Sequence, residues 1–151
     1  MHASTVAIDL AKEVFELAFA DAQGRIIERK RLSRRAFIRS LETRPPLRVL
    51  MEACGGAHCW ARRFQRQGHA VRLLPARDVR PYVRGNKTDR NDVAGILEAD
   101  RCAGIAPVPV KTPEQQGIQA LHRLREHLKA ERTATLNLLR GVLREFGVAV
   151  P

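Results

Sequence analysis

The sequence predicts an α/β fold, in which a mixed five-stranded sheet is flanked by helices and followed by a long C-terminal helical arm. Three observations support this prediction. Short segments of alternating apolar residues open the chain, strand and helix patterns then alternate, and one long helical pattern closes it. We expect one α/β domain over residues 1–107 and a helical arm over residues 108–151, which leads into a further C-terminal domain.

Three short strands joined by tight turns are expected at the N-terminus. Apolar residues alternate in residues 4–10 (STVAIDL), and residues 14–20 (VFELAFA) repeat the alternation. The DAQG turn at 21–24 contains the glycine that hairpins favour, and it leads into a third strand at 25–32. These strands should form an antiparallel meander.

Strand and helix alternate through the middle of the chain. A helix is expected over about residues 34–43, where Ser33 can serve as the N-cap. The next segments are expected as a strand, a helix, a strand and a helix, at residues 47–54, 57–67, 69–75 and 89–103. This alternation is typical of parallel strands, so the first and fourth strands can pair in parallel at the centre of a mixed sheet.

Residues 114–146 contain no proline, and their apolar residues recur at spacings of three and four from Ile118 to Phe146. One small domain would cover a helix of this length poorly. We expect these residues to assemble a homodimer or higher homo-oligomer. The alternative is a helix packed across its own sheet.

The chain is strongly basic, with 27 lysines and arginines against 16 aspartates and glutamates and a formal net charge of +11. The bases concentrate in residues 25–48 and 62–90. This charge favours a polyanionic partner, although a solvated, arginine-rich surface is the alternative. Membrane insertion is disfavoured because no apolar run approaches the roughly 20 residues that a spanning helix needs. No signal peptide is evident, so the chain is expected in the cytoplasm, associated with the nucleoid.

Cys54, His58 and Cys59 lie close together in the sequence, which raises the possibility of a zinc site. Their spacing fits no standard zinc finger, and no second pair of ligands follows. Small buried side chains are the simpler interpretation of these cysteines.

Four acidic residues stand where an expected element begins or ends. Asp9 lies in the first strand among apolar residues, and Glu52 lies near the end of the fourth. A charge in an apolar strand is unfavourable unless it is paired or binds a cation. Parallel pairing of these strands would place Asp9 beside Glu52. Asp89 and Asp92 open a later helix, and residues three apart share a helical face.

Four converging carboxylates would repel one another unless a cation lay between them. Oxygen ligands select hard cations, here Mg²⁺ or Mn²⁺, and two such ions about 4 Å apart can promote phosphodiester chemistry. Each acid alone has another interpretation. Asp89 and Asp92 can stabilise a helix N-terminus, and Glu52 can be a surface acid.

The segments AIDLAKEVFELAF, MEACGG and KTDRNDVAGILEA resemble the N-terminal domain of DEDD transposases of the Piv/MooV invertase type, a large family of insertion-sequence recombinases. The resemblance covers residues 4–105 closely and the long helix more loosely. It implies a RuvC-like domain with a ribonuclease H-like fold. It also implies that Asp9, Glu52, Asp89 and Asp92 form the catalytic, metal-binding DEDD tetrad.

The resemblance implies partners as well. Family members move or invert DNA as oligomers, and several use a structured guide RNA. A separate C-terminal domain carries a nucleophilic serine in the family, which none of the three serines here matches, so complete recombination is not expected from these residues alone. Residues expected to bind nucleic acid are Lys12, Arg34, Arg35, Arg84, Lys87 and Arg90, and Thr88 and Asn91 belong to the same motif as the last two.

The leading hypothesis is the N-terminal, divalent-metal-dependent catalytic domain of a DNA transposase or recombinase. One alternative is a non-catalytic nucleic-acid-binding and dimerisation module, which would have no need of four converging acids. Another is a phosphotransferase of the actin-like ATPase superfold. That class expects glycines after the aspartate of the first strand, whereas Leu10, Ala11 and Lys12 follow Asp9.

Overall fold

The computed structural model describes residues 2–83 and 88–150, apart from the side chain of residue 89. The chain divides into two compact units, Met1–Val110 and Lys111–Pro151. None of the helices in the described ranges combines the length and the apolar character that crossing a membrane requires.

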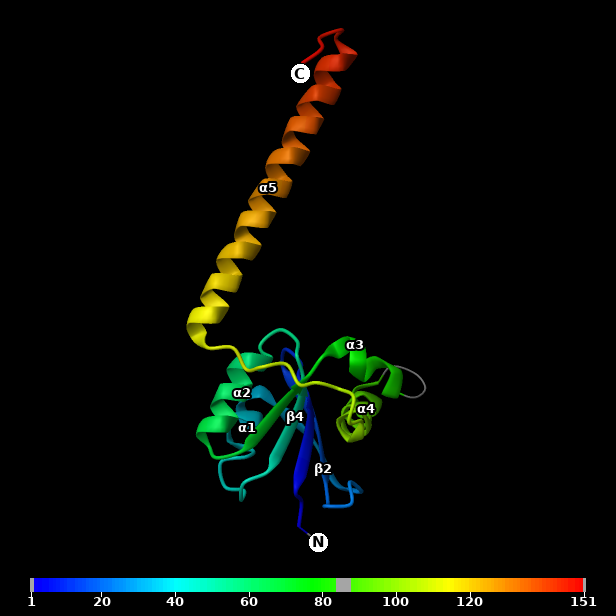
Figure 1. Cartoon of the computed structure of the whole chain (residues 1–151), viewed down its shortest axis with the longest axis vertical. Coiled ribbons are helices and arrows are strands. Elements are labelled where there is room, and N and C mark those ends of the chain that lie inside the picture. Colours follow the sequence, from blue (N-terminus) through cyan, green and yellow to red (C-terminus); the bar gives the residue numbers. More distant parts are fainter. Residues whose placement is uncertain (1, 84–87, 151) are drawn as a thin grey trace. The chain divides into compact units, whose positions relative to one another are not determined.

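A mixed five-stranded sheet forms the centre of the first unit, with strand order β3-β2-β1-β4-β5 (Figure 1). The first three strands pair antiparallel, while β1, β4 and β5 run parallel to one another. The predicted meander and the predicted parallel pairing of the first and fourth strands are both confirmed. The strands are β1 (Thr5–Asp9), β2 (Val14–Ala20), β3 (Ile26–Ser33), β4 (Arg48–Glu52) and β5 (Ala70–Leu74).

Helices cover both faces of this sheet, which agrees with a ribonuclease H-like α/β fold. In Figure 1, α1 and α2 lie on one side of the sheet, and α3 and α4 lie on the other. The helices are α1 (Arg34–Arg39), α2 (Ala57–Arg66), α3 (Ala76–Val79) and α4 (Asp89–Arg101), and a short 3₁₀ helix, Arg80–Tyr82, follows α3.

Strand alternation divides the core into two layers. Val6, Ile8 and Met51 face α1 and α2, where Phe37 and Phe64 pack against them. Alternate residues of β1, β2 and β4 face α4 instead, and they include Ala7, Ala18 and Leu50, which pack with Val93 and Ile96. This division fixes which side chains lie beneath α4.

Two expectations were inaccurate in the connections. The helix expected over residues 34–43 ends at Arg39, because Ser40 caps it and donates its hydroxyl to the Phe37 carbonyl at 2.8 Å. Ser33 is its N-cap as expected, and its Oγ accepts from the Ala36 N–H. The sequence reasoning also missed α3 and the 3₁₀ helix between β5 and α4.

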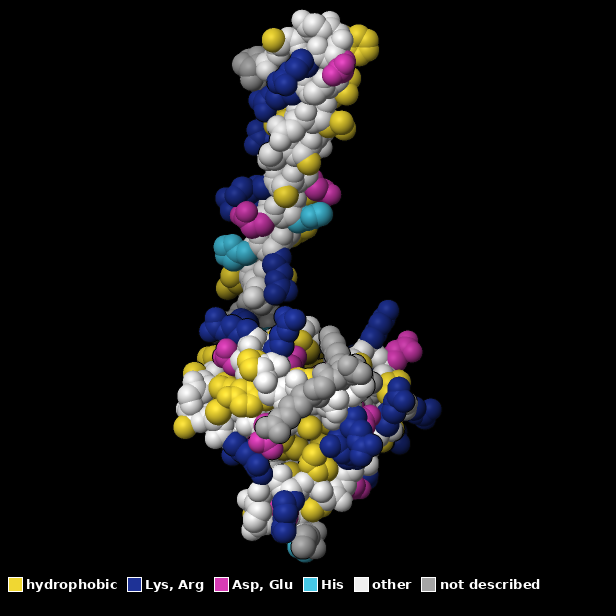
Figure 2. Space-filling view, turned by 90° about the vertical axis from the view of Figure 1, so that its right-hand side faces the viewer, with side chains coloured by type: hydrophobic (Ala, Val, Ile, Leu, Met, Phe, Trp, Pro, Cys, Tyr) yellow, Lys and Arg dark blue, Asp and Glu magenta, His cyan; other side chains and the backbone are white. Residues whose placement is uncertain are grey.

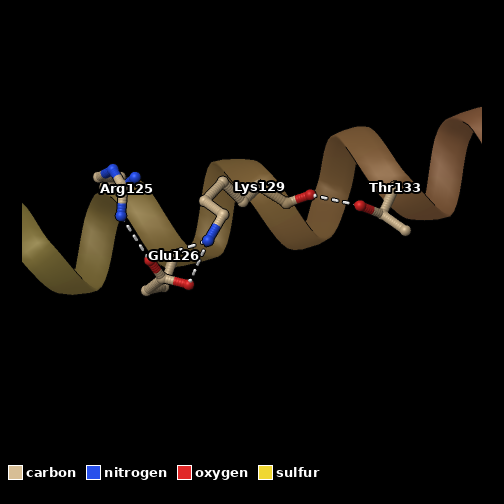
Figure 3. Close-up of polar contacts among 4 residues, drawn as sticks. All are labelled: Arg125, Glu126, Lys129 and Thr133. Atoms are coloured by element: carbon tan, nitrogen blue, oxygen red, sulfur yellow. Dashed lines mark hydrogen bonds and ion pairs between the residues drawn. The ribbon is translucent and has the colours of Figure 1, made fainter.

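The predicted long helix is confirmed as α5, Pro113–Glu145, whose 33 residues span about 50 Å at 1.5 Å per residue. Thr112 and Gln115 form a capping box at its start, with Pro113 in the first turn. Exposed polar pairs support its middle: Glu126 accepts from Arg125 and Lys129, and Thr133 donates to the Lys129 carbonyl (Figure 3).

Candidate metal and nucleic-acid site

Asp9 and Glu52 end two neighbouring parallel strands. The β1–β4 register pairs Ile8 with Met51, and Asp9 and Glu52 follow directly after that pair. By alternation both acids lie on the α4 face of the sheet, because Ala7, two residues before Asp9, belongs to the core beneath α4. Both are half-buried, so the strand ends hold two carboxylates side by side at one edge of the sheet.

The two carboxylates affect the pKa of the Cys54 thiol. The expectation of small buried side chains is wrong for Cys54 and Cys59, which are both exposed. Partial desolvation of its thiol still raises the pKa of Cys54, and the negative charges of Glu52 and Asp9 raise it further. A negative charge disfavours a nearby thiolate, so both Asp9 and Glu52 lie close enough to Cys54 to affect its pKa. Cys54 lies just past β4, and its N–H donates to the Glu52 carbonyl at 2.9 Å. This effect agrees with the strand register in placing Asp9 near Glu52.

The first turn of α4 carries the other two predicted acids. Thr88 caps the helix, and its hydroxyl accepts from the Asn91 N–H at 3.3 Å. Asp92 is half-buried one turn before Ile96, which packs on the sheet. Asp89 is the first residue of the helix, and its side chain lies outside the described part of the structure.

The other end of α4 is fixed to the sheet by an ion-pair cluster. Asp100 is only 8% exposed, and its Oδ1 accepts from Arg48 Nη2 at 2.8 Å and Arg72 Nη1 at 3.0 Å. These arginines come from β4 and β5, so the cluster joins α4 to two parallel strands. Arg101 also donates to the Gln23 carbonyl at 2.7 Å. The helix that bears Asp92 is therefore held at a defined position over the sheet.

The described residues do not by themselves complete a metal site. Across residues 2–83 and 88–150, leaving out the side chain of residue 89, no three His, Cys, Asp or Glu side chains gather closely enough to hold an ion. The structure brings Asp9 and Glu52 together and puts Asp92 on the helix above the same face. The donors present are carboxylate oxygens, which suit Mg²⁺ or Mn²⁺ rather than a soft metal.

Sequence reasoning missed a third acid at this edge. Glu16 of β2 lies directly opposite Asp9 in the antiparallel register, so it shares the α4 face and is half-buried. A signal was present, because Glu16 alternates with Phe15 and Leu17, which face the other core layer. We call Glu52, Asp9 and Glu16, on β4, β1 and β2, the acid row.

Arg29 of β3 lies beside the first turn of α4. Its Nη1 donates to the main-chain carbonyl of Arg90 at 3.2 Å. Burial lowers the pKa of Arg29, and the positive charge of Arg90 lowers it further, while the charge of Glu16 acts in the opposite direction. Arg90 was expected at a nucleic-acid surface, and Arg29 was not singled out.

The other predicted nucleic-acid contacts are spread along the same edge. Arg34 and Arg35 open α1 directly after β3, and both are exposed. Arg34 donates to the Lys12 carbonyl at 3.0 Å in the connection that follows β1. Arg84 and Lys87 lie outside the described residues. Figure 2 shows several separate groups of lysines and arginines on the face of this unit that bears α4, with apolar and acidic side chains between them.

Comparisons with known proteins give the family context. A family model described as "Transposase", for the DEDD transposases of the IS110 type, matches residues 6–148. A probable family 20 transposase of Pseudomonas aeruginosa is 44% identical over 151 residues, which cover 98% of this chain and 44% of that protein. The transposase for insertion sequence element IS1111A of Coxiella burnetii is 41% identical over 143 residues, which cover 95% of this chain and 39% of that protein.

A third relative also matches nearly the whole of this chain with less than half of its own length. The transposase for insertion sequence element IS1328 of Yersinia enterocolitica is 38% identical over 150 residues, which cover 99% of this chain and 45% of that protein. The chain thus spans less than half the length of each of these curated relatives.

Proposed function

This chain belongs to the DEDD transposase family of the IS110 type, and we propose that its first unit is the metal-binding catalytic part of an insertion-sequence transposase. It acts on DNA phosphodiesters with a divalent cation held by Asp9, Glu52, Asp89 and Asp92. One observation carries the proposal most strongly. The parallel pairing of β1 and β4 sets Asp9 and Glu52 side by side on the face that α4 covers.

Each part of the fold has a task in this proposal. Asp9 and Glu52 are held by strand backbone, so their carboxylates need little reorganisation to bind a cation. The α4 helix brings its acids over the strand ends, and Asp100 holds the helix there through Arg48 and Arg72. A bound Mg²⁺ or Mn²⁺ would supply charge stabilisation and an activated oxygen nucleophile. The surrounding bases position the phosphate backbone.

We further propose that α5 joins two or more copies of the chain. Its apolar positions are exposed along the helix, including Leu121 at 68% and Leu138 at 67%, and Phe146 at its C-cap is 78% exposed. A helix with exposed leucines at spacings of three and four is suited to packing against a second amphipathic helix. Oligomeric action would bring two catalytic units to one DNA substrate in the cytoplasm, and we propose a structured guide RNA as a further partner.

A non-catalytic DNA-binding and dimerisation module is the second candidate. It is favoured by the net charge of +11 together with the absence of a three-donor cluster among the described side chains. The two candidates differ in one measurable property, because only the catalytic proposal requires a specific divalent-metal site.

Calorimetric titration of Mn²⁺ into the chain tests the proposal. We expect Glu52→Gln to weaken binding by more than about tenfold, because loss of even an outer partner of a metal ligand costs roughly 10–100-fold. Glu42→Gln is the matched control, since Glu42 is exposed and pairs with Arg63 at 3.1 Å. Equal binding by both variants would place the ion elsewhere. If Mn²⁺ did not bind with or without DNA while DNA did, the binding module would be the better account.

A further inference from the structure

The α4 face of β3 carries two arginines that the family tetrad does not include. Arg29 lies opposite Ala18, and Arg31 lies opposite Glu16, so both share a face with the acid row. Arg31 and the side chain of Arg90 are exposed, and Arg29 is half-buried. We call Arg29, Arg31 and Arg90 the β3–α4 arginine cluster.

These arginines differ from most of their neighbours in what they contact. Arg25, Arg44 and Arg48 each have a carboxylate partner at 2.9 Å or less. Within the described ranges, Arg31 makes no ion pair and no side-chain hydrogen bond. Arg29 donates only to a neutral carbonyl there, that of Arg90. The cluster therefore keeps cationic groups available to an anion outside the protein.

Two like charges are also held near each other at this place. Partial burial lowers the pKa of the Arg29 guanidinium, and the nearby charge of Arg90 lowers it further, while Glu16 acts in the opposite direction. Such an arrangement is unfavourable for the free chain and becomes favourable when an anion binds between the groups. Arginine is the side chain best suited to a phosphate, because its planar group can donate two parallel hydrogen bonds.

The distance from the arginines of β3 to Asp9 on β1 can be compared with the spacing of phosphates in DNA. Strands in a sheet lie about 4.8 Å apart, so β3 is about 10 Å from β1. Each strand of a duplex rises about 3.4 Å per nucleotide along the helix axis, so a duplex whose axis runs across β1, β2 and β3 covers this separation in about three nucleotides. A strand whose reacting phosphate lies at Asp9 and Glu52 could therefore place the phosphate about three nucleotides away at Arg29 and Arg31.

We infer that the β3–α4 arginine cluster binds a backbone phosphate of the DNA strand whose reacting phosphate lies at the acid row. This inference rests on the proposed function, because it takes the acids as the reacting centre. The cluster fixes the path of the strand across the sheet and contributes no sequence discrimination, since phosphate contacts position a nucleic acid without reading its bases.

A purely structural role predicts something different. The arginines could serve only to offset the charges of the acid row, given that Glu16 lies opposite Arg31. Their removal would then destabilise the fold and leave DNA affinity per folded molecule unchanged.

The test is DNA binding by fluorescence anisotropy at several salt concentrations, in EDTA, with the 151-residue chain. The variant is the double substitution Arg29→Gln and Arg31→Gln. The control is Arg39→Gln, an exposed arginine on α1 across the sheet from α4. We expect the double variant to lower the slope of log K against log salt by about 0.7–0.9 for each phosphate that the protein no longer neutralises. The control should change the slope less than half as much as the double variant does.

The remaining outcomes are equally decisive. A decrease of the slope in Arg39→Gln that equals half the decrease in the double variant, and thus the same decrease for each charge removed, would show that the cluster acts only as general surface charge and would overturn the inference. Unchanged DNA binding with lower resistance to urea would assign the arginines a structural role. A single-stranded RNA of matching sequence that responds to the variant when DNA does not would overturn the choice of DNA. None of these results depends on metal, so the Mn²⁺ titration judges the proposed catalytic function separately.

Discussion

At the scale of single residues, the pKa of Cys54 depends on the charges of the two strand-end acids, Asp9 and Glu52. Partial desolvation raises the pKa of its thiol, and the charges of Glu52 and Asp9 raise it further. We predict that Asp9→Asn lowers the pKa of Cys54, because one of the charges that disfavour the thiolate is gone. The rate of iodoacetamide labelling against pH, followed at each cysteine by peptide mass spectrometry, measures this shift.

Labelling of Cys59 on α2 provides the internal reference in the same samples. A Cys54 profile that Asp9→Asn left unchanged would mean that Asp9 lies farther from Cys54 than the strand register indicates. Labelling is done in EDTA, because a cation bound at these acids would offset the charges whose effect on Cys54 is measured.

Asp21 illustrates a residue whose charge supports the fold rather than the site. Its carboxylate accepts from the Arg25 N–H at 2.8 Å, from the Gln23 N–H at 3.0 Å and from Arg25 Nε at 2.9 Å, which closes the β2–β3 turn. The backbone hydrogen bond from Arg25 is the main reason that the pKa of Asp21 is lowered. A lowered carboxyl pKa stabilises the fold above the unfolded value of about 3.9, and this stabilisation is lost as the pH falls through the folded pKa.

We therefore predict that Asp21→Asn destabilises the chain at pH 7 and that the difference from wild type shrinks below about pH 4. Urea unfolding at pH 7, 5 and 3 measures the free energies. A difference that stayed constant over this range would show that the charge of Asp21 contributes nothing.

At the scale of elements, Gly95 permits the close approach of α4 to the segment that precedes residue 84. A Cβ at Gly95 would lie 2.7 Å from Val83 Cγ2 and 3.1 Å from the Val83 nitrogen. We predict that Gly95→Ala destabilises the chain by about 1–2 kcal/mol, because overpacking of about 1–3 kcal/mol exceeds the gain in helix propensity of up to about 1 kcal/mol.

Gly141→Ala is the matched control in urea unfolding and far-ultraviolet circular dichroism. Nothing lies within 4 Å of a Cβ at Gly141, so this substitution should only strengthen α5. Equal stabilisation by both changes would contradict the tight packing of α4 on Val83.

The sequence allowed the sheet to be predicted well because its signals are local. Alternation in β1 and β2 sorts their side chains between two faces, and the predicted parallel pairing of β1 with β4 is confirmed. The residues of α3 and of the 3₁₀ helix give no such signal. Their sequence, ARDVRPY, has little apolar periodicity and contains Pro81, and in the structure Val79 and Tyr82 pack with Val93 and Ile96 of α4.

The site was predictable to the extent that it depends on strand ends. Asp9 and Glu52 follow from the chain order once β1 and β4 are paired. Glu16 and Arg29 require the exact register of β1, β2 and β3, which depends on the geometry of the connecting turns and does not follow from alternation alone. The catalytic assignment of Asp9, Glu52, Asp89 and Asp92 stays a prediction, as does the role of the two units as separate functional domains.

At the scale of the whole molecule, the exposed leucines of α5 make assembly the expected behaviour. We predict that the chain sediments as a dimer or higher oligomer and that Leu121→Glu with Leu128→Glu yields a monomer, because charges replace apolar contacts at 68% and 55% exposed positions. Analytical ultracentrifugation measures the state, and circular dichroism verifies that the helix persists. The control is the double substitution Arg125→Gln and Arg132→Gln, which leaves both leucines in place. A wild-type monomer would rule out α5 as the assembly element.

The central claim is that the ends of β1 and β4 and the start of α4 hold a divalent cation. The most direct measurement is an anomalous difference map from crystals of the chain soaked in Mn²⁺. The account predicts a peak within ligand distance, about 2.0–2.6 Å, of carboxylate oxygens from both Asp9 and Glu52. A peak at other acids, or none at these two when Mn²⁺ is bound elsewhere in the same crystal, would contradict it.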